Sequence, residues 1–228
     1  MLKNRIIPSL QIENEGLVKS FKFKDKTYIG DPVNAIKIFN DKEADEIILL
    51  DINSTVSGIN YELLEDMAGE AFMPLSYGGG IHEIEQAKVI FKIGIEKIIL
   101  NKSAIENPNL ISKMADLSGS SSVVVAINTK RSLFGKYEVY SSNGKKNQKI
   151  PLIDYILKIQ QLGAGEILIC DISKDGTFCG LNHELIKLLK DKVNIPILIS
   201  GGCSDLKDAK KAIMCGASGV VASSLFVF

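Results

Sequence analysis

Eight short runs of apolar, largely β-branched residues recur along the chain, separated by more polar segments. Most of these runs are continuous rather than alternating, which is typical of parallel strands covered on both faces. We therefore predict eight buried strands. They span residues 5–12, 46–52, 75–79, 97–101, 122–127, 166–172, 195–200 and 219–223.

The segments between these strands show the 3.6-residue spacing of amphipathic helices. Asp31-Pro32 and Asn60 are residues that favour a helix start, and Gly94, Gly163 and Gly216 are residues that favour a helix end. The predicted helices span residues 33–39, 61–71, 82–91, 107–117, 151–162, 182–192 and 204–215.

Strand and helix alternate seven times, and an eighth strand comes shortly before Phe228. This order predicts a single α/β domain over residues 1–228, a (β/α)8 TIM barrel whose final helix is missing from the chain. Either the polypeptide is truncated, or another element covers the outer face of the first and last strands.

The chain also repeats itself once. The segment 46–51 returns as 166–171, the glycines after the third strand return after the seventh, and 94–103 returns as 216–224. We therefore predict two half-barrels, about 1–118 and 119–228, with two similar sites at one rim. A ligand with two like ends, such as two phosphates, fits this arrangement.

Active sites of such barrels lie where the strands end, and phosphate often binds after strands seven and eight. Glycines there let an anion approach backbone N–H groups, and a short helix start adds a favourable dipole. The plain alternative is that these residues only form tight turns. The predicted phosphate-binding residues are Gly79, Gly80, Asn101, Ser103, Asp175, Gly176, Thr177, Ser200, Gly201, Gly202, Ala222 and Ser223.

Two longer connections interrupt the regular spacing, and both follow strands at the expected catalytic rim. Residues 13–30 form the first. The second, 130–150, is predicted to carry a hairpin that turns at Asn143-Gly144.

Composition narrows the possible partners. The formal net charge is +0, which argues against a nucleic acid or a membrane surface as the main partner. The four cysteines and two histidines show no metal-ligand spacing, so we expect neither a metal nor a cofactor. We expect reduced cysteines and a cytoplasmic protein, because no secretion signal or membrane span is evident.

A further set of short motifs runs from residue 5 to residue 228. They are Ile7-Pro8-Ser9-Leu10, Ser76-Tyr77-Gly78-Gly79-Gly80-Ile81, Glu106-Asn107-Pro108, Val123-Val124-Val125-Ala126, Gly163-Ala164-Gly165-Glu166-Ile167, Asp175-Gly176-Thr177 and Ser200-Gly201-Gly202. At this density they closely resemble the cyclase subunit of imidazole glycerol phosphate synthase.

The resemblance implies a (β/α)8 barrel of two half-barrels that docks a glutaminase subunit on its bottom face. Ammonia passes through the barrel and splits a bisphosphorylated ribulosyl formimino carboxamide. The products are imidazole glycerol phosphate and an aminoimidazole carboxamide ribotide. The two phosphates of the substrate would bind at the two rim sites.

The sequence departs from this family at the two catalytic aspartates, where it has Gln11 and Asn128. A side-chain amide can neither hold nor release a proton near neutral pH, so ring formation should be very slow. Lys19 matches the family lysine that folds over the substrate. Gln11, Asn128 and Lys19 are therefore the candidate catalytic positions.

Arg5, Glu46, Lys97 and Glu166 match the family's charged gate for ammonia. Side-chain layering predicts the same cluster, because three of these residues open alternate strands and Gly219 leaves a gap into which Arg5 could lean. A structural ring of salt bridges at the barrel bottom is the alternative.

Three functions remain open. The chain could be a paralogue of the cyclase that passes ammonia to a third protein, as in sugar amidination for surface polysaccharides. It could instead be a working cyclase of histidine biosynthesis in which Asp51 and Asp171 move protons. The third possibility is a non-catalytic barrel that activates the glutaminase. Whether the chain is an enzyme in its own right therefore stays undecided. His82 and His183 are expected to be structural, and Cys170 is not expected to be a nucleophile.

Overall fold

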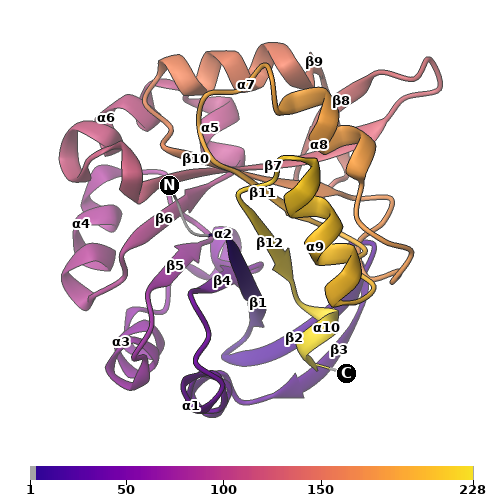
Figure 1. Ribbon diagram of the computed structural model, residues 1–228. Coiled ribbons are helices and arrows are strands. Elements are labelled where there is room, and N and C mark those ends of the chain that lie inside the picture. The colour runs from indigo at the N-terminus through magenta and orange to yellow at the C-terminus, as the bar shows by residue number, and fades with distance from the viewer. Residues whose placement is uncertain (1–3, 228) are drawn as a thin grey trace.

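Eight parallel strands close into a barrel in the computed structural model, which describes residues 4–227 (Figure 1). Hydrogen bonds join each strand to the next, and β12 pairs with both β11 and β1, which completes the circle. The predicted barrel is confirmed, and each of its strands overlaps a predicted run. The strands are β1 (Arg5–Glu13), β4 (Ile47–Asp51), β5 (Leu75–Gly78), β6 (Lys97–Leu100), β7 (Val123–Arg131), β10 (Glu166–Asp171), β11 (Ile197–Ser200) and β12 (Gly219–Ala222).

Within residues 4–227, seven helices of seven to ten residues surround the barrel. Asp31, Asn60 and Asp205 cap three of them by accepting backbone N–H groups, and Gly94 and Gly216 end two of them in a left-handed conformation. The helices are α1 (Pro32–Asp41), α3 (Tyr61–Glu70), α4 (Ile84–Ile93), α6 (Asn109–Ser118), α7 (Leu152–Gln161), α8 (His183–Leu189) and α9 (Leu206–Cys215).

Shorter helical turns lie in the connections. One of them, α10 (Ser224–Val227), follows the last barrel strand, and its Phe226 ring packs edge-on against Phe39 of α1 with centroids 6.1 Å apart. The sequence pattern predicted α10 at Ser223-Ser224 but not the other three. These are α2 (Ser54–Ser57), α5 (Lys102–Glu106) and the 3-10 turn η1 (Ser120–Ser122).

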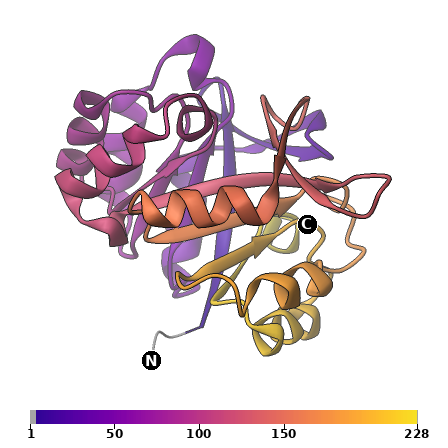
Figure 2. The same ribbon diagram turned by 90° about the horizontal axis from the view of Figure 1, so that it is seen from above.

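Two antiparallel hairpins extend the barrel beyond the carboxyl ends of its strands (Figure 2). The first long connection forms β2 (Gly16–Phe21) and β3 (Lys24–Gly30), although the sequence predicted only a loop there. The second forms β8 (Tyr137–Ser141) and β9 (Lys146–Pro151), with the predicted turn between them. We call the end of the barrel that bears these hairpins the mouth.

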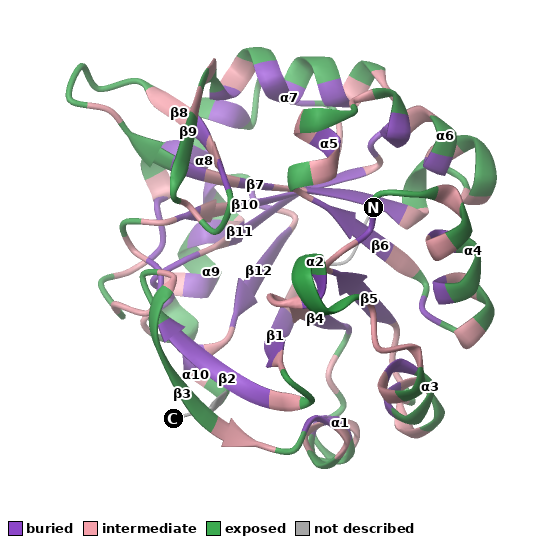
Figure 3. Ribbon diagram, turned by 180° about the vertical axis from the view of Figure 1, so that it is seen from behind, coloured by how far each residue is buried: buried purple, intermediate pink, exposed green. Residues whose placement is uncertain are grey.

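Two hydrophobic layers hold the barrel together. The larger layer lies between strands and helices, and a smaller one of seven buried aliphatic side chains fills the barrel interior. The burial is visible along every barrel strand (Figure 3). Because strand side chains alternate, Arg5, Ile7, Ser9 and Gln11 of β1 all face inward and climb from the bottom of the barrel to its mouth.

One close approach allows a test of this packing. A Cβ atom on Gly165 would lie 2.0 Å from the carbonyl oxygen of Ser120, whereas a Cβ atom on Gly69 in α3 would meet nothing within 4 Å. We expect Gly165→Ala to lower the free energy of unfolding by about 3 kcal/mol, because the backbone must shift. Gly69→Ala should raise it by about 0.5–1 kcal/mol through better helix propensity. Denaturant unfolding measures both, and equal stabilities would contradict the packing.

Candidate functional site

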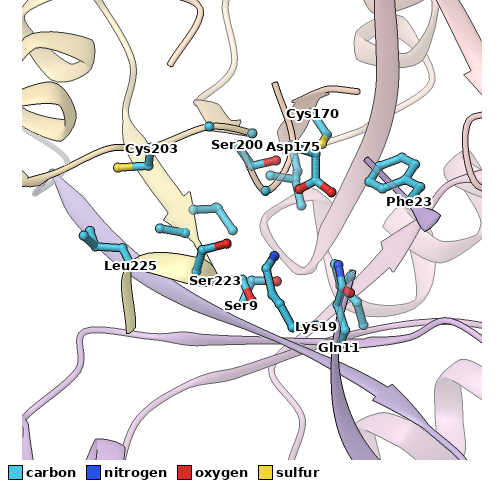
Figure 4. A pocket seen from close by; sticks show the side chains of 18 of the residues that line it. Ser9, Gln11, Lys19, Phe23, Cys170, Asp175, Ser200, Cys203, Ser223 and Leu225 are labelled. Carbon is cyan, nitrogen blue, oxygen red and sulfur yellow. The ribbon is translucent and has the colours of Figure 1, made fainter. Parts of the chain in front are cut away.

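A cavity that is partly open to solvent lies at the mouth, mostly over the second half of the barrel (Figure 4). Its wall combines inward side chains of the barrel strands with the β2–β3 hairpin and the turns after β10, β11 and β12. It contains one cation, one carboxylate, several hydroxyls and two side-chain amides. The polar side chains that line it are Ser9, Gln11, Lys19, Asn128, Cys170, Asp175, Ser200, Cys203, Ser223 and Ser224.

Gln11 and Asn128, at which the resemblance implied aspartates, both line this cavity. Gln11 is only 8% exposed, and its Oε1 atom accepts a hydrogen bond of 3.0 Å from the Ser20 hydroxyl on β2. Asn128 lies within β7, two residues beyond Ala126, which also lines the cavity. The pocket therefore has hydrogen-bonding groups, but no proton donor or acceptor of suitable pKa, at these two positions.

Lys19 and Asp175 form the charged part of the cavity. Figure 4 shows the Lys19 ammonium and the Asp175 carboxylate pointing into the same space, and both residues are more than nine-tenths buried. Burial raises the pKa of Asp175, and the charge of Lys19 partly offsets that rise. No described residue hydrogen-bonds Oδ2 of Asp175, so this atom is available to a ligand that carries a hydrogen-bond donor.

The β2–β3 hairpin lies over the turn that follows β10 and contains Asp175 and Gly176. The Lys22 N–H donates to the Asp175 carbonyl over 3.2 Å, and Gly176, at φ 71°, lies against the backbone of Ser20. A side chain at Gly176 would be strained and would push the hairpin away. The position of the β2–β3 hairpin, which holds Lys19 in the cavity, therefore depends on Gly176.

All but one of the predicted second-half phosphate residues line the cavity, and Thr177 is the exception. Gly201 and Gly202 have φ values of 96° and 86°, and a Cβ atom on either would approach a backbone oxygen within 3 Å. Ser200 and Ser223 present hydroxyls beside them. Together with Lys19, these groups can bind one phosphate by hydrogen bonds and charge.

The remaining predicted phosphate residues do not line this cavity. Gly79 and Gly80 pack against Ser54 of α2, and the Asn101 amide donates to the Ala126 carbonyl over 2.7 Å. Ser103 lies in α5, away from the cavity wall. The Thr177 hydroxyl donates to the Lys174 carbonyl, so Thr177 supports its own turn.

Asp51 and Asp171 hold matching loops in the two halves of the barrel. Oδ1 of Asp51 accepts the N–H groups of Asn53 and Ser54 over 3.1 and 2.9 Å. Oδ1 of Asp171 accepts the N–H of Ser173 over 3.0 Å, and its Oδ2 accepts an amide hydrogen of Asn182. Burial raises the pKa of Asp51, although these N–H groups counteract it. Neither aspartate lines the cavity.

The opposite end of the barrel carries the charged ring of Arg5, Glu46, Lys97 and Glu166. Arg5 donates to Glu46 over 2.5 Å and also to Glu166. Lys97 donates to both oxygens of Glu46 over 3.0 and 3.1 Å and to Glu166 over 3.3 Å. The Ser76 hydroxyl adds a bond of 2.7 Å to Glu46. Both glutamates are nearly buried and fully paired, which offsets the cost of their desolvation.

Arg5 enters the ring as expected. It pairs with Gly219 across β1 and β12, where any side chain on Gly219 would meet Leu198 at 2.7 Å. Burial alone would lower the pKa of Arg5, but its bonds to Glu166 and Glu46 raise it overall. Arg5 therefore stays protonated at any ordinary pH, and the ring joins two basic side chains to two acidic ones.

A packed aliphatic layer separates the ring from the cavity. Its seven side chains are at most 4% exposed, so the barrel interior is packed and has no open passage for ammonia of the kind that the resemblance implied. This layer has no polar group that could bind water. The layer consists of Ile7, Ile48, Ile99, Val124, Leu168, Leu198 and Val221.

Other expectations concerned a metal site, a membrane span, His82 and Cys170. Within residues 4–227, no three His, Cys, Asp or Glu side chains come together to hold a metal ion. No helix in the described part of the chain is long and apolar enough to cross a membrane. The His82 ring contacts the Gly80 carbonyl at a helix start, and Cys170 lies in the cavity wall, where burial and the neighbouring Asp175 raise the pKa of its thiol.

Sequence reasoning missed a partly buried pair near the cavity. His183 Nε2 lies 2.7 Å from Oδ1 of Asp208 in α9, and Oδ2 of Asp208 accepts the N–H groups of Leu181 and Ser204. Asp208 thus joins the turns after β10 and β11. Ser204 and Asp208 lie four positions apart in the sequence, but no local pattern linked His183 to them.

The fold and the cavity define a class of protein, a (β/α)8 barrel with a polar cavity at its mouth and a charged ring at its bottom. Comparison with known proteins gives the family. Residues 5–228 match the family model described as "Histidine biosynthesis protein". The chain is 47% identical, over its whole length and 91% of the relative, to the "Putative imidazole glycerol phosphate synthase subunit HisF" of Leptospira borgpetersenii.

Two further relatives support the same placement. The chain is 43% identical over its whole length to the "Putative imidazole glycerol phosphate synthase subunit hisF3" of Vibrio vulnificus, of which it covers 89%. It is 38% identical over 99% of its length to the "Imidazole glycerol phosphate synthase subunit HisF" of Alkaliphilus metalliredigens, of which it covers 91%. The chain belongs to the histidine biosynthesis protein family, among the HisF-type cyclase subunits.

The Asp208 pair predicts how stability depends on pH. Burial would raise the pKa of Asp208, but the N–H groups of Leu181 and Ser204 and the contact with His183 lower it below 3.8. A lowered pKa in the folded state means that the carboxylate stabilises the fold above roughly pH 4, and that this stabilisation is lost as the pH falls further. We expect Asp208→Asn to cost about 1–2 kcal/mol near pH 7 and much less near pH 3. Urea unfolding at both pH values measures this, with the exposed Asp191→Asn as the control.

Proposed function

We propose that the chain is a cyclase-type subunit that receives ammonia from a glutaminase subunit and passes it to another acceptor, as in the amidination of a sugar. It would do so while holding a phosphorylated ligand at its mouth. The observation that carries this proposal is the pairing of an intact charged ring with a cavity that lacks both aspartates.

The loss of acid–base groups argues against efficient ring formation. Each positioned proton-transfer group typically contributes about 10²–10⁴ in rate. Gln11 and Asn128 can still hydrogen-bond a ligand, but they cannot exchange protons with it. Asp51 and Asp171 are a poor substitute, because loop N–H groups occupy them and they lie outside the cavity wall.

The cavity supports a phosphorylated ligand of the bisphosphate type. One phosphate would bind among Lys19, Ser200, Ser223 and the glycine turn at 201–202, with Ala222, Gly176 and Asp175 beside it. The second would bind the matching turn of the first half-barrel. The residues proposed there are Gly79, Gly80, Asn101 and Ser103.

The charged ring suits a gate for ammonia better than a plain stabilising core. Hydrophobic residues of similar volume would stabilise the barrel bottom at least as well as four paired charges. A neutral molecule such as ammonia could pass when Lys97 or Arg5 swings toward solvent, since both side chains are 19% exposed. The aliphatic layer above would exclude water and ions while ammonia crosses it through side-chain motion.

A working cyclase of histidine biosynthesis is the second candidate. The identity of 38% to relatives named as imidazole glycerol phosphate synthase subunits favours it. The two candidates differ in one measurable property, the rate of ring formation with ammonia supplied directly.

That rate gives the main test. We supply ammonium and the bisphosphorylated carboxamide substrate and follow release of the carboxamide ribotide. We expect turnover lower than that of an active cyclase by about 10⁴ or more, and a gain of at least about 10² in Gln11→Asp/Asn128→Asp. Asn143→Asp, in the β8–β9 turn, is the matched control.

Two results would contradict the proposal in different ways. Normal turnover of the native chain would identify a working cyclase. No gain in the double variant would mean that the bisphosphate does not fit the cavity.

Glutaminase docking can be tested at the ring end. Phe72 is 88% exposed in the turn before β5. Strand β5 lies between β4, which starts beside Glu46, and β6, which starts at Lys97, so this turn is at the ring end of the barrel. Asn40 holds this turn by accepting the Phe72 N–H and donating to the Glu70 carbonyl. An exposed, rigidly held aromatic residue is a typical interface anchor.

We therefore expect Phe72→Ala to weaken binding of the purified glutaminase subunit by about 10–100-fold in calorimetry. Phe134→Ala removes an equally exposed ring at the mouth and should have no effect. If both variants bind the glutaminase with the affinity of the native chain, the prediction that the glutaminase docks at the Phe72 turn is wrong.

A further inference from the structure

The turn between β7 and β8 exposes two adjacent apolar side chains. Leu133 is 103% exposed and Phe134 is 93% exposed, and the turn projects beyond the barrel (Figure 2). We call Leu133 and Phe134 the ribbon tip. Single exposed apolar residues are ordinary, but two neighbouring large ones at the end of a projecting hairpin have no role in folding, because they contact almost nothing in their own chain.

The ribbon tip is well ordered by its own backbone. The Ser132 N–H donates to the Lys136 carbonyl over 2.8 Å, and the Gly135 N–H donates to the Ser132 carbonyl over 2.9 Å. Arg131 then donates to the Gly135 carbonyl and lies over the Tyr137 ring. A turn fixed in this way presents the two apolar side chains with little further loss of entropy on binding.

The ribbon of β8, β9 and their turns, residues 130–149, is strongly basic. It contains six basic side chains and one acidic one, Glu138, whereas the whole chain has a net charge of +0. Three of the six flank the ribbon tip, and Lys145 and Lys146 lie at the opposite end of β8. All six are exposed, and among the described residues only Arg131 has an ion pair, a distant one of 3.8 Å with Glu184. The six are Lys130, Arg131, Lys136, Lys145, Lys146 and Lys149. Such a patch attracts an acidic surface and orients it.

The ribbon is joined to the wall of the candidate site. Its first strand, β7, carries Asn128 in the cavity, and the Tyr137 hydroxyl accepts a hydrogen bond of 2.9 Å from Asn182, which also donates to Asp171. A partner that binds the ribbon tip would therefore contact the end of the barrel that bears the cavity.

We propose that the ribbon tip and its basic flanks dock the enzyme that consumes the ammonia, through an acidic surface with an apolar recess. This inference rests on the proposed function. Ammonia that leaves the mouth into water is protonated at neutral pH and loses its nucleophilicity, so the acceptor must cover the opening. Basic charge alone could steer a phosphorylated ligand, but steering does not account for Leu133 and Phe134.

The partner can be identified in the producing cells. A photoreactive phenylalanine analogue is placed at position 134, and at position 72 as the matched control. We expect position 134 to cross-link to an amidating enzyme and position 72 to cross-link to the glutaminase. Cross-linking of position 134 only to a second copy of this chain, to lipid or to the glutaminase would overturn the proposal.

The captured enzyme is then purified and assayed with this chain and the glutaminase. We expect Leu133→Ser/Phe134→Ser to lower glutamine-dependent amidation by about tenfold or more, and to leave amidation from added ammonium unchanged. Full glutamine-dependent amidation in the presence of this variant would overturn the proposal. Binding of the native chain, but not the variant, to phosphatidylglycerol vesicles would assign the tip to a membrane instead.

The measurements made with the glutaminase distinguish failure of this inference from failure of the proposed function. Glutaminase docking can depend on Phe72 while glutamine-derived ammonia reaches the acceptor equally well with the native tip and with the Leu133→Ser/Phe134→Ser tip. In that case the proposal for the ribbon tip fails and the proposed function stands. If no glutamine-derived ammonia reaches any acceptor through the native chain, the proposed function fails as well.

Discussion

Closure of eight parallel strands into one barrel forces every second side chain of each strand into a narrow interior. Arg5, Ile7, Ser9 and Gln11 show the consequence on β1, since steps of two residues lead from the charged ring through the aliphatic layer to the cavity. The other strands obey the same alternation. A single substitution at an inward position therefore changes one layer and leaves the other layers intact.

This layering explains how the mouth can change its chemistry without loss of the barrel. The ring at the bottom is electrically neutral and fully paired, and the aliphatic layer isolates it from the mouth. The amides at positions 11 and 128 carry no charge, so Asp175 is the carboxylate in the cavity wall and it faces Lys19. These amides can form hydrogen bonds but cannot exchange protons near neutral pH.

The two half-barrels share a framework but differ at their mouths. Asp51 and Asp171 each bind the loop that follows their strand, so the repeat reflects a common way of shaping βα turns. In the first half, α2 packs against the glycine turn at 79–80. In the second half, the corresponding turn at 201–202 opens onto the cavity, and the β2–β3 hairpin closes over it.

The barrel, its strands and main helices, the β8–β9 hairpin and the charged ring could be predicted from the amino-acid sequence, because periodicity, caps and inward spacing are local properties. The β2–β3 hairpin could not, since its register depends on pairing with β1. Folding also brings His183 to Asp208 and leaves Oδ2 of Asp175 without a hydrogen bond beside Lys19. Such pairs lie on separate elements, and packing of the closed barrel, rather than any spacing along the chain, decides which of them meet.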